Sequence, residues 1–229
     1  MPIERFLKEL QRRDPKAIVF QKQLPETSAH FGTLSMPLPE PLNVYLKSRK
    51  LALYTHQAEA IERARTGVNI VITTPTASGK TLAFNLTVFE RLYQNPDATA
   101  LYLYPLKALA QDQLQAIQEL EQGTGVQSHA AIYDGDTPQH LRSVIRDESR
   151  IILTNPYALH QYLPWHHKWR RFFQNVQFVV IDESHTYRGV FGSNVALLVR
   201  RLRRIAEHYG AQPQFILSSA TMANPQEHS

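Results

Sequence analysis

The sequence predicts an α/β fold in which a mostly parallel sheet carries helices on both faces. Six short apolar runs rich in β-branched and aromatic residues alternate with longer segments of helical periodicity. The chain has 229 residues, enough for one large core or for one domain with a small attachment. Apolar residues make up 43% of it, which is typical of a folded domain rather than a disordered one.

The expected strands are the runs at 68–73, 99–104, 129–133, 151–154, 176–181 and 214–218. Helical spacing of apolar residues predicts helices at 81–93, 106–121, 137–147 and 195–209. The third of these begins at Thr137-Pro138, a cap followed by a proline that suits a first helical turn. Because parallel sheets bind ligands at the carboxyl ends of their strands, functional residues are expected there.

The first part of the chain differs in pattern from the rest. A short helix is expected at 4–12, and an extended proline-rich linker at 36–41. We therefore expect an accessory segment and linker over residues 1–44 and a single α/β domain over residues 45–229.

Composition excludes several classes of protein. The chain has no cysteine, which excludes a disulfide framework, a cysteine nucleophile and a thiolate zinc site, and we expect no zinc. No apolar run reaches the roughly 18 residues of a membrane span, so no membrane partner is expected. The start of the chain lacks the layout of a secretory signal. We expect a cytoplasmic protein, associated with the nucleoid if it is bacterial.

The net charge of +5 favours an anionic partner, although weakly. Two basic clusters are open to two interpretations. The arginines of 200–204 suit a solvated helix face, or alternatively a surface for nucleic acid. Trp165 and Trp169 lie among cations, which suits a packed segment with a basic rim, or alternatively aromatic stacking on bases.

A phosphate-binding loop is expected between the first predicted strand and the helix at 81–93. Small residues allow backbone N–H groups to converge on phosphate oxygens at a helix N-terminus. Lys80 is expected to reach the β- and γ-phosphates of ATP, and the Thr81 hydroxyl to bind Mg²⁺. The loop comprises Thr74, where such loops usually have glycine, and then Pro75, Thr76, Ala77, Ser78, Gly79, Lys80 and Thr81. The alternative is a simple turn rich in small residues.

Two further strands end in residues that suit this chemistry. The strand at 176–181 leads into Asp182, a candidate Mg²⁺ ligand, and Glu183, a candidate for orienting the attacking water. The strand at 214–218 leads into Ser219-Ala220-Thr221, for which a strand followed by a helix cap is the alternative interpretation.

Together these motifs resemble the first RecA-like motor domain of superfamily 2 helicases, the DEAD/DExH class. The motifs that carry the resemblance are the P-loop, Asp182-Glu183-Ser184-His185 and Ser219-Ala220-Thr221, in that order. The longer stretches 103–113 and 181–194 resemble one branch, the MrfA-type, RecQ-related helicases. That resemblance implies an ATP-dependent DNA helicase, moving 3′ to 5′, that acts in the repair of crosslinked or alkylated DNA.

The resemblance also implies roles for individual residues. Gln57 is expected to bind the adenine edge with Tyr54 packing nearby, and His185 to act as a catalytic-site relay to the coupling motif of Ser219, Ala220 and Thr221. The residues expected to contact nucleic acid are Pro105, Lys107, Asp134, Gly135, Thr154, Asn155 and Pro156.

The implied partners are single-stranded DNA and a second motor domain of the same polypeptide, which this sequence does not contain. The family branch also has a cysteine-cluster domain that is absent here. We therefore expect a fragment that binds and hydrolyses nucleotide poorly and does not unwind a duplex alone. The alternatives are an RNA helicase of the same superfamily, a P-loop kinase or transporter ATPase, and a non-catalytic module that binds nucleic acid or a partner.

Overall fold

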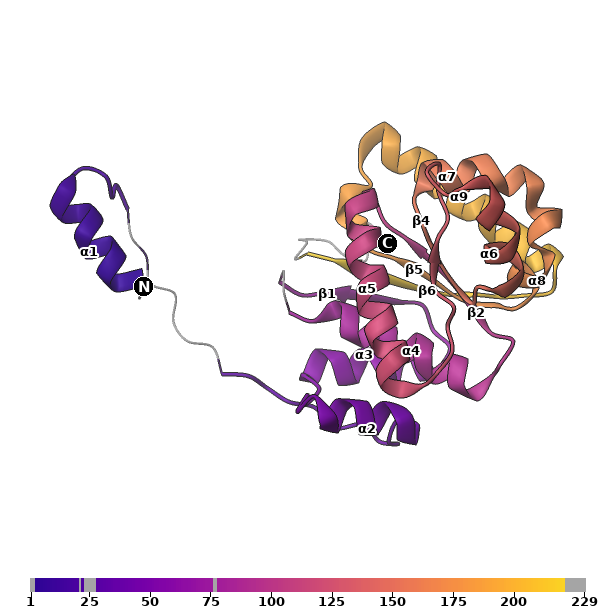
Figure 1. Cartoon of the computed structure of the whole chain (residues 1–229), viewed down its shortest axis with the longest axis horizontal. Helices are drawn as coiled ribbons and strands as arrows, with labels where there is room; N and C mark the ends of the chain where they lie inside the picture. Colours follow the sequence, from indigo (N-terminus) through magenta and orange to yellow (C-terminus); the bar gives the residue numbers. More distant parts are fainter. Residues whose placement is uncertain (1–2, 21, 23–27, 76–77, 221–229) are drawn as a thin grey trace. The chain divides into compact units, whose positions relative to one another are not determined.

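The computed structural model describes residues 3–20, 22, 28–75 and 78–220 (Figure 1). In these residues six strands form one sheet in the order β1-β6-β5-β2-β4-β3, and all neighbouring strands are parallel. The strands are β1 (Ile70–Thr73), β2 (Thr99–Leu103), β3 (Ala131–Ile132), β4 (Ile151–Thr154), β5 (Val176–Ile181) and β6 (Gln214–Ser219). The predicted α/β fold with a parallel sheet is confirmed.

Helices cover both faces of the sheet (Figure 1). One face packs against α2 (Glu40–Ser48), α3 (Thr55–Arg65), α4 (Lys80–Gln94) and α5 (Lys107–Thr124). The other packs against α6 (Arg142–Glu148), α7 (Pro156–Tyr162), α8 (Arg170–Gln174) and α9 (Gly189–His208). Every residue of β2 and β4 is buried, as expected of strands covered on both sides. Within the described ranges, three 3₁₀ segments join the elements: η1 (Gln139–Leu141), η2 (Leu163–Trp169) and η3 (Ser184–Thr186).

The core under α4 shows what stabilises this arrangement. Phe84 and Phe89 are completely buried among strand and helix side chains, and Tyr102 of β2 packs edge-on against Phe84 at 5.9 Å between ring centroids. Burial of each of these rings contributes roughly 1.5–3 kcal/mol. The same helix begins at Lys80, so this packing fixes the position of the residues that follow β1.

Two predicted elements are shorter in the structure than in the sequence pattern. The strand expected at 129–133 is reduced to β3, because His129 has a φ of 45°, which interrupts an extended backbone. The helix expected at 137–147 begins with η1 and becomes α-helical only at Arg142. Thr137 is instead part of a turn, where its hydroxyl accepts from the Asp134 N–H at 2.9 Å.

The domain boundary expected at residue 44 needs correction. The chain divides into two compact units, Met1–His30 and Phe31–Ser229. Residues 31–44 belong to the second unit because Leu38 and Leu42 are buried in its core, and because the Gly32 N–H donates to the Leu53 carbonyl. The proline-rich segment is thus held against the domain. The first unit contains the predicted helix, α1 (Ile3–Arg13), none of whose residues is buried.

No helix in the described part of the chain combines the length and apolar character that a membrane span needs.

Candidate nucleotide and nucleic-acid site

The predicted motifs gather at one edge of the sheet. In a parallel sheet all carboxyl ends lie at the same edge, and each of the six strands leads into a predicted motif there. The P-loop follows β1, and Asp182 follows β5, with β6 lying between them. The remaining motifs begin at Ser219 (β6), Pro105 (after β2), Thr154 (β4) and Asp134 (after β3).

The P-loop closes on itself through its own backbone. Gly79 has a φ of 81°, a conformation that favours glycine, and caps the N-terminus of α4. Lys80 is buried, and its ammonium donates to the carbonyl oxygens of Thr74 and Pro75 at 2.8 and 3.1 Å. The hydroxyls of Thr74 and Ser78 form a hydrogen bond of 2.6 Å. The cation thus lies inside the loop, where phosphate oxygens can replace its carbonyl partners. Thr76 and Ala77 lie outside the described residues.

Gln57, the predicted adenine-binding residue, supports the P-loop. Its side chain is only 2% exposed, its Nε2 donates to the Gly79 carbonyl at 2.8 Å, and its Oε1 accepts from the Tyr54 N–H at 2.8 Å. Both ends of the amide are engaged inside the protein. An adenine contact is therefore restricted to the second N–H and the remaining lone pair of this amide.

Two further aromatic residues lie near this site, His56 in contact with the P-loop and Phe31 in contact with Tyr54. The His56 ring nitrogen Nε2 lies 3.0 Å from the Ser78 carbonyl, so a second side chain of α3 contacts the P-loop. Phe31 pairs with Tyr54 through an antiparallel bridge, and their rings stack at 5.4 Å between centroids. The sequence spacing of Tyr54 and His56 is compatible with such contacts, but nothing in the pattern points to Phe31, which lies 23 residues upstream of Tyr54.

The adjacent carboxylates of Asp182 and Glu183 point to different tasks. Asp182 is 8% exposed and one of its oxygens accepts from the Glu183 N–H, which leaves its other oxygen available. Glu183 has a φ of 50°, which turns the chain sharply after β5. A carboxylate at Asp182 and a hydroxyl at Thr81 are oxygen donors of the kind that Mg²⁺ prefers, and Mg²⁺ keeps several waters besides. These residues therefore fit the expected ion.

The negative charge of Asp182 also affects two buried phenols. Burial, and to a smaller extent Asp182, raises the pKa of Tyr187 above its ordinary value. Burial likewise raises the pKa of Tyr104, with smaller contributions from Tyr102 and Asp182. Both hydroxyls therefore remain protonated, and in the described part of the chain neither Oη has a hydrogen-bond partner.

His185 joins the carboxylate pair to the end of β6. Its Nδ1 lies 3.2 Å from Glu183 Oε2 and 3.2 Å from Ser219 Oγ, and the Ala220 N–H donates to it at 3.4 Å. One ring nitrogen cannot serve all of these partners at once. It donates to Glu183 only when it carries a proton, and it accepts from Ala220 only when it does not. Thr221 lies outside the described residues.

The residues expected to contact nucleic acid divide into surface and interior groups. Lys107 and Asp136 form an exposed salt bridge of 2.5 Å, and this pairing raises the pKa of Lys107. Gly135 is exposed beside Asp134, which is buried and accepts from the Asp136 N–H at 2.9 Å. Pro105 is half-buried. The first residue of α5 therefore presents the Lys107 ammonium, and the segment after β3 presents exposed backbone around Gly135.

Thr154 does not lie on the surface. It is 1% exposed and its hydroxyl donates to the Tyr133 carbonyl at 2.7 Å, so it joins β4 to the chain after β3. The expectation of a direct contact through this hydroxyl is corrected by its burial. Asn155 caps α7 by accepting from the Ala158 N–H at 2.9 Å, and Pro156 is buried in the first turn.

Within the described residues, no three His, Asp or Glu side chains gather closely enough to hold a metal ion by themselves.

Known proteins resemble this chain over most of its length. The DEAD/DEAH box helicase family profile matches residues 54–228. An ATP-dependent helicase of Bacillus subtilis, YprA, is 47% identical over 83% of this chain and 26% of its own length. ATP-dependent helicase HRQ1 of Saccharomyces cerevisiae is 40% identical over 90% of this chain and 19% of its own length.

A solved structure gives the same result in three dimensions. The DUF1998 helicase MrfA bound to DNA and AMPPNP superposes with a TM-score of 0.90 and is 42% identical, over 98% of this chain and 32% of that chain. The resemblance to MrfA-type helicases is thus confirmed, and the chain spans less than a third of these relatives. Because one family profile takes in the P-loop, the Asp182-Glu183 pair and Ser219-Ala220, the chain belongs to the DEAD/DEAH box helicases.

Proposed function

We propose that the chain is the first motor domain of an ATP-dependent DNA helicase, which binds ATP with Mg²⁺ and holds single-stranded DNA. The observation that carries this proposal is the contact of His185 with both Glu183 and Ser219, one strand away from the P-loop. A relative 42% identical to this chain has been solved with DNA and AMPPNP together, which supports the choice of both ligands.

In this proposal the P-loop holds the phosphates. Lys80 exchanges its carbonyl partners for β- and γ-phosphate oxygens, and the N-terminus of α4 adds its positive field. Thr81 and Asp182 hold Mg²⁺, which neutralises charge that develops on the phosphates. Glu183 orients the attacking water, for which its position at the turn after β5 is suitable.

His185 provides the coupling between the two ligands. Loss of the γ-phosphate changes what Glu183 binds, and this changes whether the ring nitrogen serves Glu183 or the Ser219-Ala220 segment. A shift of that segment then reaches the strand-binding surface, as expected of a coupling motif. His185 Nδ1 thus has two alternative states in this proposal: with a proton it donates to Glu183, and without one it accepts from Ala220.

The DNA strand is held chiefly through phosphates. Lys107 supplies charge, the backbone around Gly135 and Asn155 supplies N–H groups, and Thr154 positions these loops from inside the fold. Such contacts carry no sequence information and weaken as salt rises. We further infer 3′ to 5′ movement, a role in DNA repair and a cytoplasmic location from the MrfA-type resemblance.

In this proposal a second motor domain completes the ATP site by supplying an arginine. In phosphoryl-transfer systems a partner arginine contributes about 10³–10⁵ in rate. The chain alone therefore binds nucleotide weakly, hydrolyses it slowly and does not separate strands. We assign the motor to residues 31–229 and an accessory role to residues 1–30, following the two compact units.

The proposal is tested by titrating the purified chain with a fluorescent ATP analogue in the presence of Mg²⁺. Lys80→Ala is expected to lose binding, whereas Glu183→Gln keeps binding and loses the residual hydrolysis. Lys47→Ala, which removes an exposed lysine of α2, is the matched control and keeps both. Equal binding by Lys80→Ala and the parent chain would refute the nucleotide site.

The strand partner is tested by measuring the affinity for single-stranded DNA and RNA of one sequence at several salt concentrations. Tighter binding of DNA, with affinity falling steeply as salt rises, is the expected result. Tighter binding of RNA favours the RNA helicase, and affinity that tracks base sequence but ignores salt contradicts phosphate contact. Robust unwinding by the chain alone contradicts the need for a second motor domain.

A further inference from the structure

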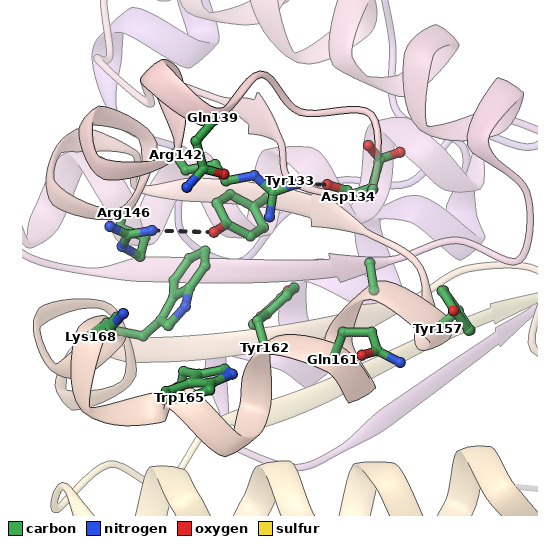
Figure 2. A pocket seen from close by; sticks show the side chains of 13 residues that line it. Tyr133, Asp134, Gln139, Arg142, Arg146, Tyr157, Gln161, Tyr162, Trp165 and Lys168 are labelled. Atoms are coloured by element: carbon green, nitrogen blue, oxygen red, sulfur yellow. Dashed lines mark hydrogen bonds between the residues drawn. The ribbon is translucent and has the colours of Figure 1, made fainter.

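A pocket lies beside the expected strand path, at the carboxyl ends of β3 and β4 (Figure 2). Its volume is about 360 Å³, within the range of small-ligand sites. Asp134 and Gly135 form one end of its lining, and α7, which follows Asn155-Pro156, supplies another part. The pocket therefore opens between the two segments that are expected to hold the strand.

The floor of the pocket is a rigid aromatic cluster. Tyr133, Tyr162 and Trp169 are all buried, with ring centroids 4.5–5.1 Å apart. Trp165 differs from them, because it lines the same pocket but remains 57% exposed. Tyr157 lines the pocket as well and is 76% exposed, so two exposed aromatic side chains are available to a ligand beside a floor that cannot easily collapse.

Three cations surround this aromatic lining. The Arg142 guanidinium is fixed by the carbonyls of Asp134 and Thr137 and lies 5.3 Å from the Tyr133 ring centroid. Arg146 donates to the Tyr133 hydroxyl at 3.3 Å, a contact drawn in Figure 2. The third cation is Lys168, which lies over the Trp165 ring.

The Lys168 ammonium lies 5.2 Å from the Trp165 ring centroid. In the described part of the chain none of the three cations forms a salt bridge, and Asp134 is the one carboxylate of the lining. The lining thus carries three cationic side chains and one carboxylate, so the pocket has a net positive charge. An anion is the partner that this arrangement favours.

Two amide side chains complete the lining. Figure 2 shows Gln139 with Arg142 and Arg146 along one wall, and Gln161 with Tyr162 and Trp165 along the opposite wall. An amide offers a donor and an acceptor together, the pattern that pairs with the edge of a base. An aromatic face, an amide and a cation correspond to the stacking face, the edge and the phosphate of one nucleotide.

We propose that this pocket receives one nucleotide of the bound single strand, with its base against Trp165 and a phosphate beside Arg146 and Lys168. The inference rests on the proposed function, since it presumes that a strand crosses the domain. A single strand has no base pairs, so one base enters the pocket without breaking a pair. An acidic protein segment would use the cations but neither the indole face nor the amides.

The test compares oligo-dT with an abasic oligonucleotide of the same length, which has the same phosphates but no bases. Stacking on an aromatic contributes about 1–3 kcal/mol per base, and 1.4 kcal/mol corresponds to a tenfold change. We expect the parent chain to bind oligo-dT about tenfold more tightly, and Trp165→Ala to bind both equally. Trp165→Phe keeps most of the difference, and Tyr93→Ala, which removes an exposed aromatic of α4, keeps all of it.

Tryptophan fluorescence gives a second, independent measurement. The chain has two tryptophans, and Trp169 is 2% exposed. Oligo-dT is therefore expected to quench the emission of Trp165, with no quenching in Trp165→Phe. Lys168→Gln is expected to lower the salt dependence by about one phosphate contact, whereas Lys47→Gln leaves it unchanged.

The outcomes separate this inference from the proposed function. If neither oligonucleotide binds, the strand-binding function fails and the inference with it. If both bind equally to the parent chain, the function stands and the pocket proposal is overturned. Quenching by free dTMP at the same concentration as oligo-dT overturns the strand assignment and identifies a mononucleotide site. Displacement of oligo-dT by a poly-glutamate peptide from the parent chain and from Trp165→Ala alike, but not from Lys168→Gln, identifies an acidic protein partner instead.

Discussion

Replacement of Gln57 by glutamate tests the buried link between α3 and the P-loop. The two side chains have nearly the same shape, so packing is preserved. The introduced carboxylate keeps the acceptor for the Tyr54 N–H, but it loses the donor and places an oxygen where Nε2 of Gln57 now lies 2.8 Å from the Gly79 carbonyl. When protonated, the same side chain donates to that carbonyl again. The effect of the substitution therefore depends on pH.

The sign follows from the environment of the side chain. Burial and the facing carbonyl oxygen disfavour the charged form, so the pKa of the introduced carboxyl in the folded chain is raised above the usual value of about 4.3. The folded variant then holds its proton more tightly than the unfolded one, and its stability falls as pH rises above about 4.3 until the folded pKa is passed. Each pKa unit by which the folded value exceeds the unfolded value lowers the free energy of unfolding by about 1.4 kcal/mol. A pKa that is two units higher in the folded chain therefore costs about 2.7 kcal/mol.

The assay is urea unfolding of the parent chain and the variant at pH 5 and pH 8. We expect the variant to lose roughly 1 kcal/mol at pH 5 and about 3 kcal/mol at pH 8, with a parallel loss of ATP-analogue binding. Gln118→Glu, which adds the same charge at an exposed position of α5, is the control. An equal loss by Gln57→Glu at both pH values would refute the reasoning.

Two more predictions concern the same edge of the sheet. Gly79→Ala and Gly67→Ala both place a side chain at a φ of 81°, which costs about 1–2 kcal/mol, but only the Cβ at position 79 meets Gln57 Nε2, at 2.5 Å. Gly79→Ala is therefore expected to unfold at lower urea than Gly67→Ala and to lose nucleotide binding, and coincident unfolding curves would contradict the close approach. Thr154→Val leaves the Tyr133 carbonyl buried without its partner and lowers the free energy of unfolding by about 1–2 kcal/mol, whereas Thr66→Val, at an exposed hydroxyl, changes it little. The salt dependence of DNA binding stays the same in Thr154→Val, and a smaller salt dependence would show that the hydroxyl contacts a phosphate.

Sequence patterns predicted the sheet well because buried parallel strands leave a plain signal. β4 and β5 coincide with the predicted runs, since both are apolar along most of their length and polar residues follow directly. Residues 31–44 were misassigned because prolines suggest a linker. In the structure Leu38 is buried, and the guanidinium of Arg65 in α3 donates to the Met36 and Pro37 carbonyls. These contacts depend on a helix that lies later in the sequence, so the proline pattern alone does not reveal them.

The candidate site was predictable where chemistry is local. The residues of the P-loop, and likewise Asp182 and Glu183, are adjacent in the sequence. The local motif is therefore enough to predict that they lie together. The engagement of Gln57 with Gly79, the burial of Thr154 and the stacking of Phe31 on Tyr54 arise from contacts between separate elements. No local pattern encodes such contacts. The two tryptophans likewise looked equivalent in the sequence, although one is buried and the other exposed.

The strand order has a consequence for how the ends of this domain communicate. Neighbouring strands are about 4.8 Å apart, so β5 and β4 are separated by about 10 Å, and β1 and β3 by about 24 Å. Close-packed interiors of this kind barely stretch. The sheet therefore keeps the distance between the P-loop, which follows β1, and the aromatic pocket, which lies beside β3 and β4, nearly constant. If the proposed function holds, a step along DNA is therefore carried by loops at the edge of the sheet, or by the whole sheet moving as one piece.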